Sequence, residues 1–203
     1  MNSSRMNNRL AIAVLGCASL LAALLIAGLD TRLRDRISAN ETEYQARKLE
    51  ELLDGHSYNN QPWADVIRID NKPVDAVYPA TQDETVTAMV IAVTSREGYV
   101  GPIGLLVATT PDGRISGIRI AAHRETPGLG DRIESGRSDW LLQFSGERLG
   151  DDAGRRWQTT LDGGEFDALS GATVTSRAVI DTLYRTLLWL QKRPDLQNAE
   201  SDG

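Results

Sequence analysis

The residues best suited to chemistry lie in one short segment, Asp167–Ser176, which reads DALSGATVTS. It places small residues and hydroxyl groups at the start of an amphipathic stretch, Val174–Leu190. Apolar residues recur in that stretch at helical spacing, so we expect the segment to lie at a helix N-terminus (Val179, Leu183, Leu187 and Leu190). Unpaired backbone N–H groups and the positive end of the helix dipole favour a phosphate there. Because Thr173 puts a hydroxyl group at the same place, the arrangement suits a phosphate that is covalently attached.

The same residue types also have an ordinary structural role. Ser, Thr and Asp are the usual N-cap residues of helices, and most helix starts that are rich in them bind no ligand. Residue types alone therefore leave two interpretations open for Thr173, a phosphate acceptor or a helix cap.

A second group of candidate residues, the Pro-Gly loop, lies at His123–Arg132 and reads HRETPGLGDR. Gly128 and Gly130 follow a proline and would let the backbone approach a flat ligand closely. Glu125 and Thr126, together with the histidine, add polar groups at the same place. The alternative is an ordinary loop with solvated polar residues, because a short glycine motif has low specificity.

The elements that must position these residues are predicted to be mainly strands. The stretch Thr85–Thr94 is β-branched and alternates in polarity. Ile103–Thr109 and Ile115–Ala121 flank the turn sequence TPDGR and predict a β-hairpin. Asp139–Phe144 predicts a short helix, and the chain after Pro194 is polar. Together these patterns predict an α+β domain with a mainly antiparallel sheet.

An uncharged segment, Leu10–Leu29, precedes this domain. At 1.5 Å per residue it would span about 30 Å as a helix, which is the thickness of a bilayer core. A cleavable secretory signal has a shorter apolar region and a small-residue cleavage site, and no such site follows Leu29. The segment therefore predicts an uncleaved transmembrane helix. Cys17, the only cysteine, is predicted to be a small apolar residue of that helix and not a lipid attachment site.

Composition excludes several classes of function. The formal net charge is −6, and the segment before Asp30 contains two arginines and no acidic residue, so the remainder is still more acidic. An acidic domain is a poor binder of nucleic acid and anionic lipid. One cysteine and two histidines exclude a thiolate or histidine-rich metal site. The G-x-G-x-x-G motif of dinucleotide sites and the G-x-S-x-G motif of many hydrolases are both absent from the sequence.

The two motifs together resemble a known family. The sequence FDALSGATVTSRAV, Phe166–Val179, is similar to the D-x-x-(S/T)-G-A-T signature of proteins that carry FMN on a threonine through a phosphoester. The other matching segments are YNN at Tyr58–Asn60, GYVGPIGLLV at Gly98–Val107 and HRETPGLGDRI at His123–Ile133. In this order and spacing the chain resembles the FMN-binding G subunit of the Rnf (Rsx) electron-transport complex. It is similar, more distantly, to the C subunit of the sodium-translocating NADH:quinone oxidoreductase.

The resemblance implies a role for each candidate residue. Thr173 would accept FMN, which a flavin transferase installs from FAD, and Asp167 would be recognised by that enzyme. In the Pro-Gly loop, main-chain groups would meet the polar edge of the flavin ring and Leu129 would pack on its face. The residues expected to bind the cofactor are Glu125, Thr126, Gly128, Leu129, Gly130, Ser170, Gly171, Ala172, Thr173 and Thr175.

The resemblance also implies an electron relay in the bacterial inner membrane. The chain would pass electrons between other subunits of an ion-translocating complex that works with NADH and ferredoxin, and would have no catalytic residue or metal of its own. The expected organisation is a cytoplasmic N-terminus (1–9), a transmembrane helix (10–29), a juxtamembrane helix to about residue 53 with a linker (30–62), a periplasmic FMN-binding domain (63–193) and a flexible tail (194–203). Two alternatives are a noncatalytic membrane-anchored scaffold without flavin, in which Thr173 is only a helix cap, and a single-component flavoprotein reductase.

Overall fold

The computed structural model describes residues 47–69, 73–151 and 153–197, together with Ser19, of the 203-residue chain. The predicted cytoplasmic N-terminus lies outside the described residues. So do the predicted transmembrane helix at 10–29, apart from Ser19, and most of the predicted tail. Within the described part, no helix combines the length and the apolar character needed to cross a bilayer.

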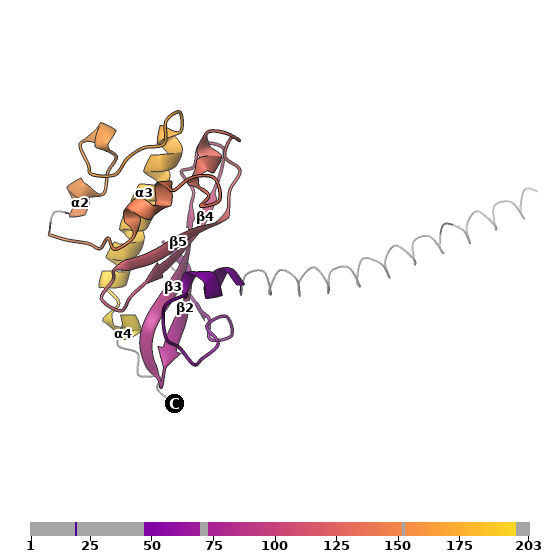
Figure 1. The fold of residues 1–203 in the computed structure, drawn as a ribbon, viewed down its shortest axis with the longest axis vertical. Helices are drawn as coiled ribbons and strands as arrows, with labels where there is room; N and C mark the ends of the chain where they lie inside the picture. Colours follow the sequence, from indigo (N-terminus) through magenta and orange to yellow (C-terminus); the bar gives the residue numbers. More distant parts are fainter. Residues whose placement is uncertain (1–18, 20–46, 70–72, 152, 198–203) are drawn as a thin grey trace, which may run out of the picture. The chain divides into compact units, whose positions relative to one another are not determined.

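A five-stranded antiparallel sheet forms the centre of the described domain (Figure 1). The strands lie side by side in chain order, and each pairs antiparallel with the next. They are β1 (Ile67–Arg68), β2 (Val74–Gln82), β3 (Thr85–Ser95), β4 (Ile103–Thr109) and β5 (Ile115–Ala122). The predicted α+β class with a mainly antiparallel sheet is therefore confirmed, and the three predicted strands are found as β3, β4 and β5.

Two tight turns connect the longer strands. The predicted hairpin between β4 and β5 closes with a 2.9 Å hydrogen bond from Thr110 N–H to Arg114 O. Strands β2 and β3 are joined by Asp83 and Glu84, which have φ angles of 51° and 67°. Left-handed values at both central residues are those of the two-residue turn that suits the twist of a hairpin. The sequence does not indicate β2, because Pro79 lies within it and an Asp-Glu pair is not a usual signal for this turn.

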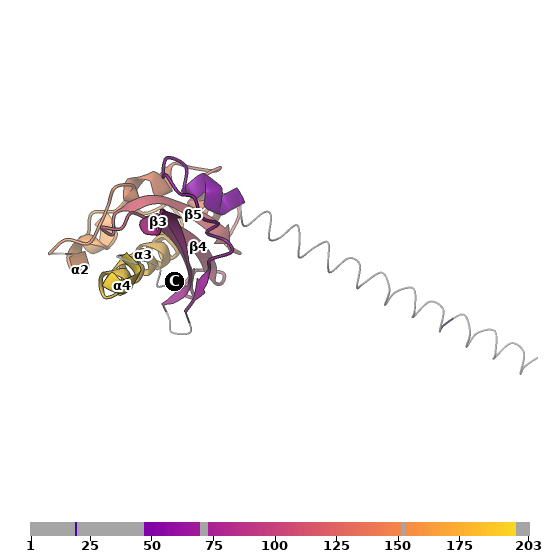
Figure 2. The ribbon, with the colours of Figure 1, turned by 90° about the horizontal axis from the view of Figure 1, so that it is seen from below.

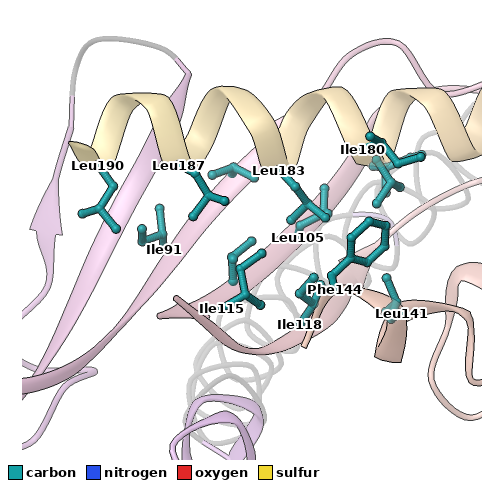
Figure 3. Packing of buried hydrophobic residues seen from close by; sticks show 14 of the residues in the cluster. Ile91, Leu105, Ile115, Ile118, Leu141, Phe144, Ile180, Leu183, Leu187 and Leu190 are labelled. Atoms are coloured by element: carbon teal, nitrogen blue, oxygen red, sulfur yellow. The ribbon is translucent and has the colours of Figure 1, made fainter. Parts of the chain in front are cut away.

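Helix α3 (Thr173–Gln191) covers one face of the sheet (Figures 1 and 2). All four positions predicted to face the core are buried (Val179, Leu183, Leu187 and Leu190). Figure 3 shows leucines of this helix directed toward Ile91, Leu105 and Ile115 on the strands, with which they form one buried cluster. Burying each side chain of this size contributes about 1.5–3 kcal/mol. Hydrophobic packing along this stripe therefore fixes α3 on the sheet.

The opposite face of the sheet is covered by helical residues 47–52. Leu49, Leu52 and Leu53 are buried there in a second cluster with small and aliphatic residues of the strands (Ala80, Ala88, Val90, Leu106 and Ala108). Of the helix predicted to lead up to about residue 53, residues 47–52 are found as helix, and residues 30–46 lie outside the described residues. Because both faces are covered, β3 and β4 are apolar on both sides.

A group of short helices lies between β5 and α3. They are the 3₁₀ segments η1 (Gly130–Ile133), η2 (Trp140–Phe144) and η3 (Thr160–Asp162), and the α-helical turn α2 (Ala153–Arg156). The predicted short helix at 139–144 is found as η2. Ring contacts join Phe144, Trp157 and Phe166 at centroid distances of 4.8–6.3 Å. This aromatic cluster anchors the chain just before the segment that leads into α3. The short helix α4 (Pro194–Gln197) ends the described chain.

We expect Leu183→Ala to lower the free energy of unfolding by about 2–5 kcal/mol, because Leu183 is fully buried between α3 and the sheet. Leu142→Ala is the matched control, since Leu142 is 63% exposed and should change stability by less than about 0.5 kcal/mol. Equilibrium denaturation of the two variants measures both values. Equal losses of stability would contradict the assigned core.

Candidate functional site

The two sequence motifs meet at the N-terminus of α3, where they line a single cavity of about 350 Å³. This volume falls in the range of roughly 300–1,000 Å³ that is usual for small-molecule sites. The residues that line it are Tyr99, Glu125, Thr126, Leu129, Gly130, Gly171, Ala172, Thr173, Val174 and Thr175. The structure thus brings together eight of the ten residues expected to bind the cofactor. The other two, Gly128 and Ser170, are exposed and lie outside the cavity lining.

The topology of the sheet explains why two of the loops lie side by side. Strand β4 begins directly after residues 98–102, which we call the 98–102 loop, and β5 ends directly before the Pro-Gly loop. The two strands are antiparallel neighbours, with Gly104 paired to Ala122. The start of one strand and the end of the other therefore occur at the same edge of the sheet, and both loops leave from that edge.

Thr173 is the first residue of α3 and does not cap it. The N-cap position is occupied by Ala172, which makes no side-chain capping hydrogen bond, and the first turn contains no acidic residue. Thr173 is half-buried, and its hydroxyl makes no hydrogen bond within the described part of the chain. The interpretation of Thr173 as a helix cap is therefore wrong. A partner-free hydroxyl lies instead beside backbone N–H groups that no side chain caps.

The turn that precedes α3 is held by Ser176, which sequence reasoning did not single out. The buried Ser176 hydroxyl accepts a 2.9 Å hydrogen bond from Leu169 N–H and donates a 3.0 Å bond to Ala172 O. Gly171 has φ of +78°, and a Cβ atom there would lie 3.0 Å from Leu129 Cδ2. A small residue with left-handed φ is therefore needed where the turn meets the Pro-Gly loop. The available signal for Ser176 was its position in the first helical turn, where a serine hydroxyl can reach the main chain of the preceding turn.

Glu125 joins three separate segments. Its carboxylate is buried, and Oε1 accepts a 3.1 Å hydrogen bond from Val100 N–H in the 98–102 loop. Oε2 accepts a 2.5 Å hydrogen bond from the hydroxyl of Thr175 in the first turn of α3. Among the described residues no cationic side chain forms an ion pair with it. A buried carboxylate is costly unless it is hydrogen-bonded, so these two donors hold the loop and the helix against it.

Two glycines make room for this carboxylate. A Cβ atom at Gly98 would lie 2.9 Å from Glu125 Oε1, and one at Gly130 would lie 2.9 Å from Glu125 Oε2. A Cβ atom at Gly130 would also lie 3.1 Å from the Thr175 hydroxyl oxygen. The sequence predicts that Gly130 allows close approach of a ligand. The structure gives a different reason for this glycine, which is the packing of Glu125.

His123 stabilises the start of the Pro-Gly loop through hydrogen bonds and does not line the cavity. Its Nδ1 accepts a 3.1 Å hydrogen bond from Glu125 N–H, so the proton of the neutral ring is on Nε2, which lies 2.7 Å from Glu134 Oε1. This hydrogen bond from His123, assisted by Arg137, lowers the pKa of Glu134. The histidine therefore orients the main chain next to the buried carboxylate.

Asp167 lies at the surface, outside the cavity. Its N–H donates a 2.8 Å hydrogen bond to Gln143 Oε1, and its main-chain oxygen accepts a 2.7 Å bond from Trp140 Nε1. Both partners belong to η2. The main chain of Asp167 is fixed in this way, and the residue stays exposed, as does Ser170.

Tyr99 and Val174 line the cavity but were not among the predicted site residues. Both are exposed, at 70% and 46% of their surface, as is Leu129 at 44%. The segment Gly98–Val107 carries part of the family resemblance, but that resemblance gives no role to Tyr99. The available signal was the position of Tyr99 just before the predicted strand Ile103–Thr109, whose predicted hairpin partner leads into the Pro-Gly loop.

Comparisons with known proteins find an FMN-binding domain and relatives that are G subunits of one kind of complex. The model of the FMN-binding domain family matches residues 98–187, which include every residue that lines the cavity. The G subunit of the ion-translocating oxidoreductase complex from Cereibacter sphaeroides is 40% identical over 86% of this chain and 80% of its own length. The protein of the same name from Pseudomonas aeruginosa is 39% identical over 86% of this chain and 84% of its own length. The one from Haemophilus influenzae is 34% identical over 93% of this chain and 92% of its own length. The crystal structure of Shewanella oneidensis NqrC is similar with a TM-score of 0.41 and 24% identity, over 61% of this chain and 69% of that one.

We expect Gly130→Ala to destabilise the protein by about 1–3 kcal/mol, because the added methyl group would overlap Glu125 and approach Thr175. Gly136→Ala is the matched control, since a Cβ atom at Gly136 has no neighbour within 4 Å and its φ is not left-handed. Thermal and chemical denaturation measure the difference. If both variants were as stable as the wild type, the tight packing around Glu125 would be wrong.

The second turn of α3 gives a prediction about pH. Arg177 binds Asp162 through two 2.7 Å hydrogen bonds. These bonds, and then the hydroxyl of Thr159, lower the pKa of Asp162 from 3.8 to about 2. The folded state thus favours the ionised carboxylate, and this contribution to stability is fully present above pH 3.8 and is lost as the pH falls toward 2.

In the Arg177→Gln variant we expect the pKa of Asp162 to rise toward 3.8, as measured by NMR titration of the carboxyl carbon. Arg185→Gln, a change further along the same helix, should leave the pKa of Asp162 near 2. A value that stays near 2 in Arg177→Gln would contradict the assigned cause.

Proposed function

This chain belongs to the family of G subunits of ion-translocating oxidoreductase complexes, and on that premise we propose that it is an electron-carrying flavoprotein subunit of such a complex. Its cofactor would be FMN, joined to Thr173 Oγ1 through a phosphoester. The observation that carries the proposal is the cavity in which the hydroxyl of Thr173 and the Pro-Gly loop lie together. The match to the FMN-binding domain family over the same residues supports it.

The residues at this place fit a tethered FMN. The hydroxyl of Thr173 is half-buried and free of hydrogen bonds within the described part of the chain, so it can be esterified without breaking a structural contact. A phosphodiester keeps one negative charge, which uncapped N–H groups at a helix N-terminus favour. The exposed apolar side chains of Leu129 and Val174 line the adjacent cavity and offer surface to a flat ring.

FMN supplies the capacity to take up and release one or two electrons, and the protein supplies its placement. The tether holds the cofactor at the cavity without a need for tight noncovalent binding, because it keeps the local concentration high. Glu125 fixes the positions of the two loops relative to the start of α3, because it accepts hydrogen bonds from Val100 N–H and from the Thr175 hydroxyl. Leu129 and Val174 would cover part of the ring and keep water from it.

Attachment would be the work of a flavin transferase that uses FAD. A bond forms between Thr173 Oγ1 and the phosphorus of the FMN half, the pyrophosphate bond of FAD breaks, AMP leaves, and the hydroxyl proton is released. The exposure of Asp167 and Ser170 supports their recognition by such an enzyme, because both can be reached from outside while the fold is intact.

The proposal extends to the whole chain. Residues 1–9 would lie in the cytoplasm, residues 10–29 would form a single inner-membrane helix, and residues 30–62 would link it to the FMN-binding domain. That domain, residues 63–193, would lie in the periplasm and end in the tail 194–203. Electrons would come from and go to other subunits, in a complex that works between NADH and ferredoxin. The sequence lacks the G-x-G-x-x-G motif, which agrees with a relay that depends on partners for NADH oxidation.

Expression of the full chain with and without a flavin transferase tests the proposal. With the transferase we expect a fluorescent band in a denaturing gel and a mass increase equal to FMN less one water. Thr173→Ala should abolish both signals, and Thr173→Ser should keep them because it retains a hydroxyl group. Thr85→Ala, an exposed threonine at the start of β3, is the control that should remain fully modified.

Two outcomes would overturn the proposal. Fluorescence that survives Thr173→Ala would place the flavin elsewhere. A wild-type chain that stays colourless and unmodified in the presence of an active transferase would favour an anchored scaffold without flavin.

A further inference from the structure

Tyr99 is an exposed aromatic side chain that lines the cavity beside Thr173. It is 70% exposed, and it makes no ring contact with another aromatic residue in the described part of the chain. Tyrosine side chains contribute most when the ring packs against another flat or apolar surface. An unpacked ring at the edge of a ligand-sized cavity is therefore available to a flat ligand inside that cavity.

The backbone that carries Tyr99 is held tightly. A Cβ atom at Gly98 would lie 2.2 Å from Gly101 O and 2.9 Å from Ile103 Cγ1, so the 98–102 loop folds back on itself against the buried start of β4. On the other side of Tyr99, Val100 N–H donates its hydrogen bond to Glu125. The position of Tyr99 is thus set by a compact turn and one buried carboxylate, although its ring is in solvent.

The rest of the cavity lining complements an aromatic ring. Leu129 and Val174 present exposed aliphatic groups from two other segments, the Pro-Gly loop and α3. Thr173 lies next to Val174 at the start of the helix. A ligand that is tethered at Thr173 and enters the cavity can therefore meet aliphatic groups and one aromatic ring.

We propose that Tyr99 makes an aromatic contact with the flavin ring carried by Thr173, and that Glu125 is a positioning residue that holds Tyr99 in place through Val100 N–H. The inference rests on the proposed function and adds a residue and a role to it. Tyr99 would touch the cofactor, whereas Glu125 would act through the main chain of the 98–102 loop.

Flavin emission in the loaded full chain tests the contact, because a phenol ring in contact with a flavin quenches its fluorescence. We expect Tyr99→Ala to raise the emission severalfold and to make it more sensitive to quenching by iodide in solution. Tyr99→Phe should also raise the emission, since it removes the phenol, but should keep the ring protected from iodide. Leu142→Ala, an exposed residue outside the cavity, should change neither signal.

The role of Glu125 is tested by two variants that differ in reach. Glu125→Gln retains an oxygen that can accept the hydrogen bond from Val100 N–H, so its emission should stay close to that of the wild type. Glu125→Asp withdraws the carboxylate by one methylene group, and its emission should move toward that of Tyr99→Ala. If both Glu125 variants matched the wild type, the positioning role would be wrong.

The outcomes separate this inference from the proposed function. If no flavin is attached to Thr173, the proposed function fails. If the flavin is attached but Tyr99→Ala leaves emission and iodide quenching unchanged, only this inference fails. In that case the exposed ring of Tyr99 would be free to contact another protein of the complex and not the cofactor.

Discussion

One buried carboxylate determines the shape of the site. Glu125 receives a main-chain N–H from the 98–102 loop and a hydroxyl from the first turn of α3, while it belongs itself to the Pro-Gly loop. Because no cationic side chain among the described residues pairs with the Glu125 carboxylate, these neutral donors are what offset the cost of burying it. The glycines at 98 and 130 follow from the same constraint, since any side chain there would overlap the carboxylate. Loss of this carboxylate would remove the hydrogen bonds that join the 98–102 loop, the Pro-Gly loop and the first turn of α3.

The remainder of the fold brings these segments within reach of that carboxylate. Strands β4 and β5 are paired so that the two loops leave from the same edge of the sheet. Helix α3 is fixed on one face by its leucine stripe, and residues 47–52 cover the other face. The hydroxyl of Thr173 is therefore positioned by packing that extends along the whole helix. A tether on a helix that is packed along its length would give a precise site to a cofactor that would otherwise be held by loops alone.

The elements whose formation depends on local sequence alone could be predicted. The helical stripe of α3 and the hairpin between β4 and β5 depend on local periodicity and turn chemistry, and both are found as predicted. Strand β2 could not be predicted, because a proline inside a strand is tolerated only where other hydrogen bonds complete the strand edge. Here Asn60 Nδ2 donates a hydrogen bond to Pro79 O, and Thr81 N–H donates one to Asn60 Oδ1. The role of Glu125 was also hidden, since a glutamate in a polar loop is normally solvated. Only tertiary packing buries it, and the same packing leaves Tyr99 exposed at the cavity.

The central claim is that the residue proposed to carry FMN and the Pro-Gly loop form one binding site. The most direct measurement is a set of nuclear Overhauser contacts in the flavin-loaded full chain, between the two ring methyl groups of the flavin and the methyl groups of Leu129 and Val174. We expect contacts to both residues, because both line the cavity beside Thr173. A flavin that is attached to Thr173 but shows contacts to neither residue would contradict the claim.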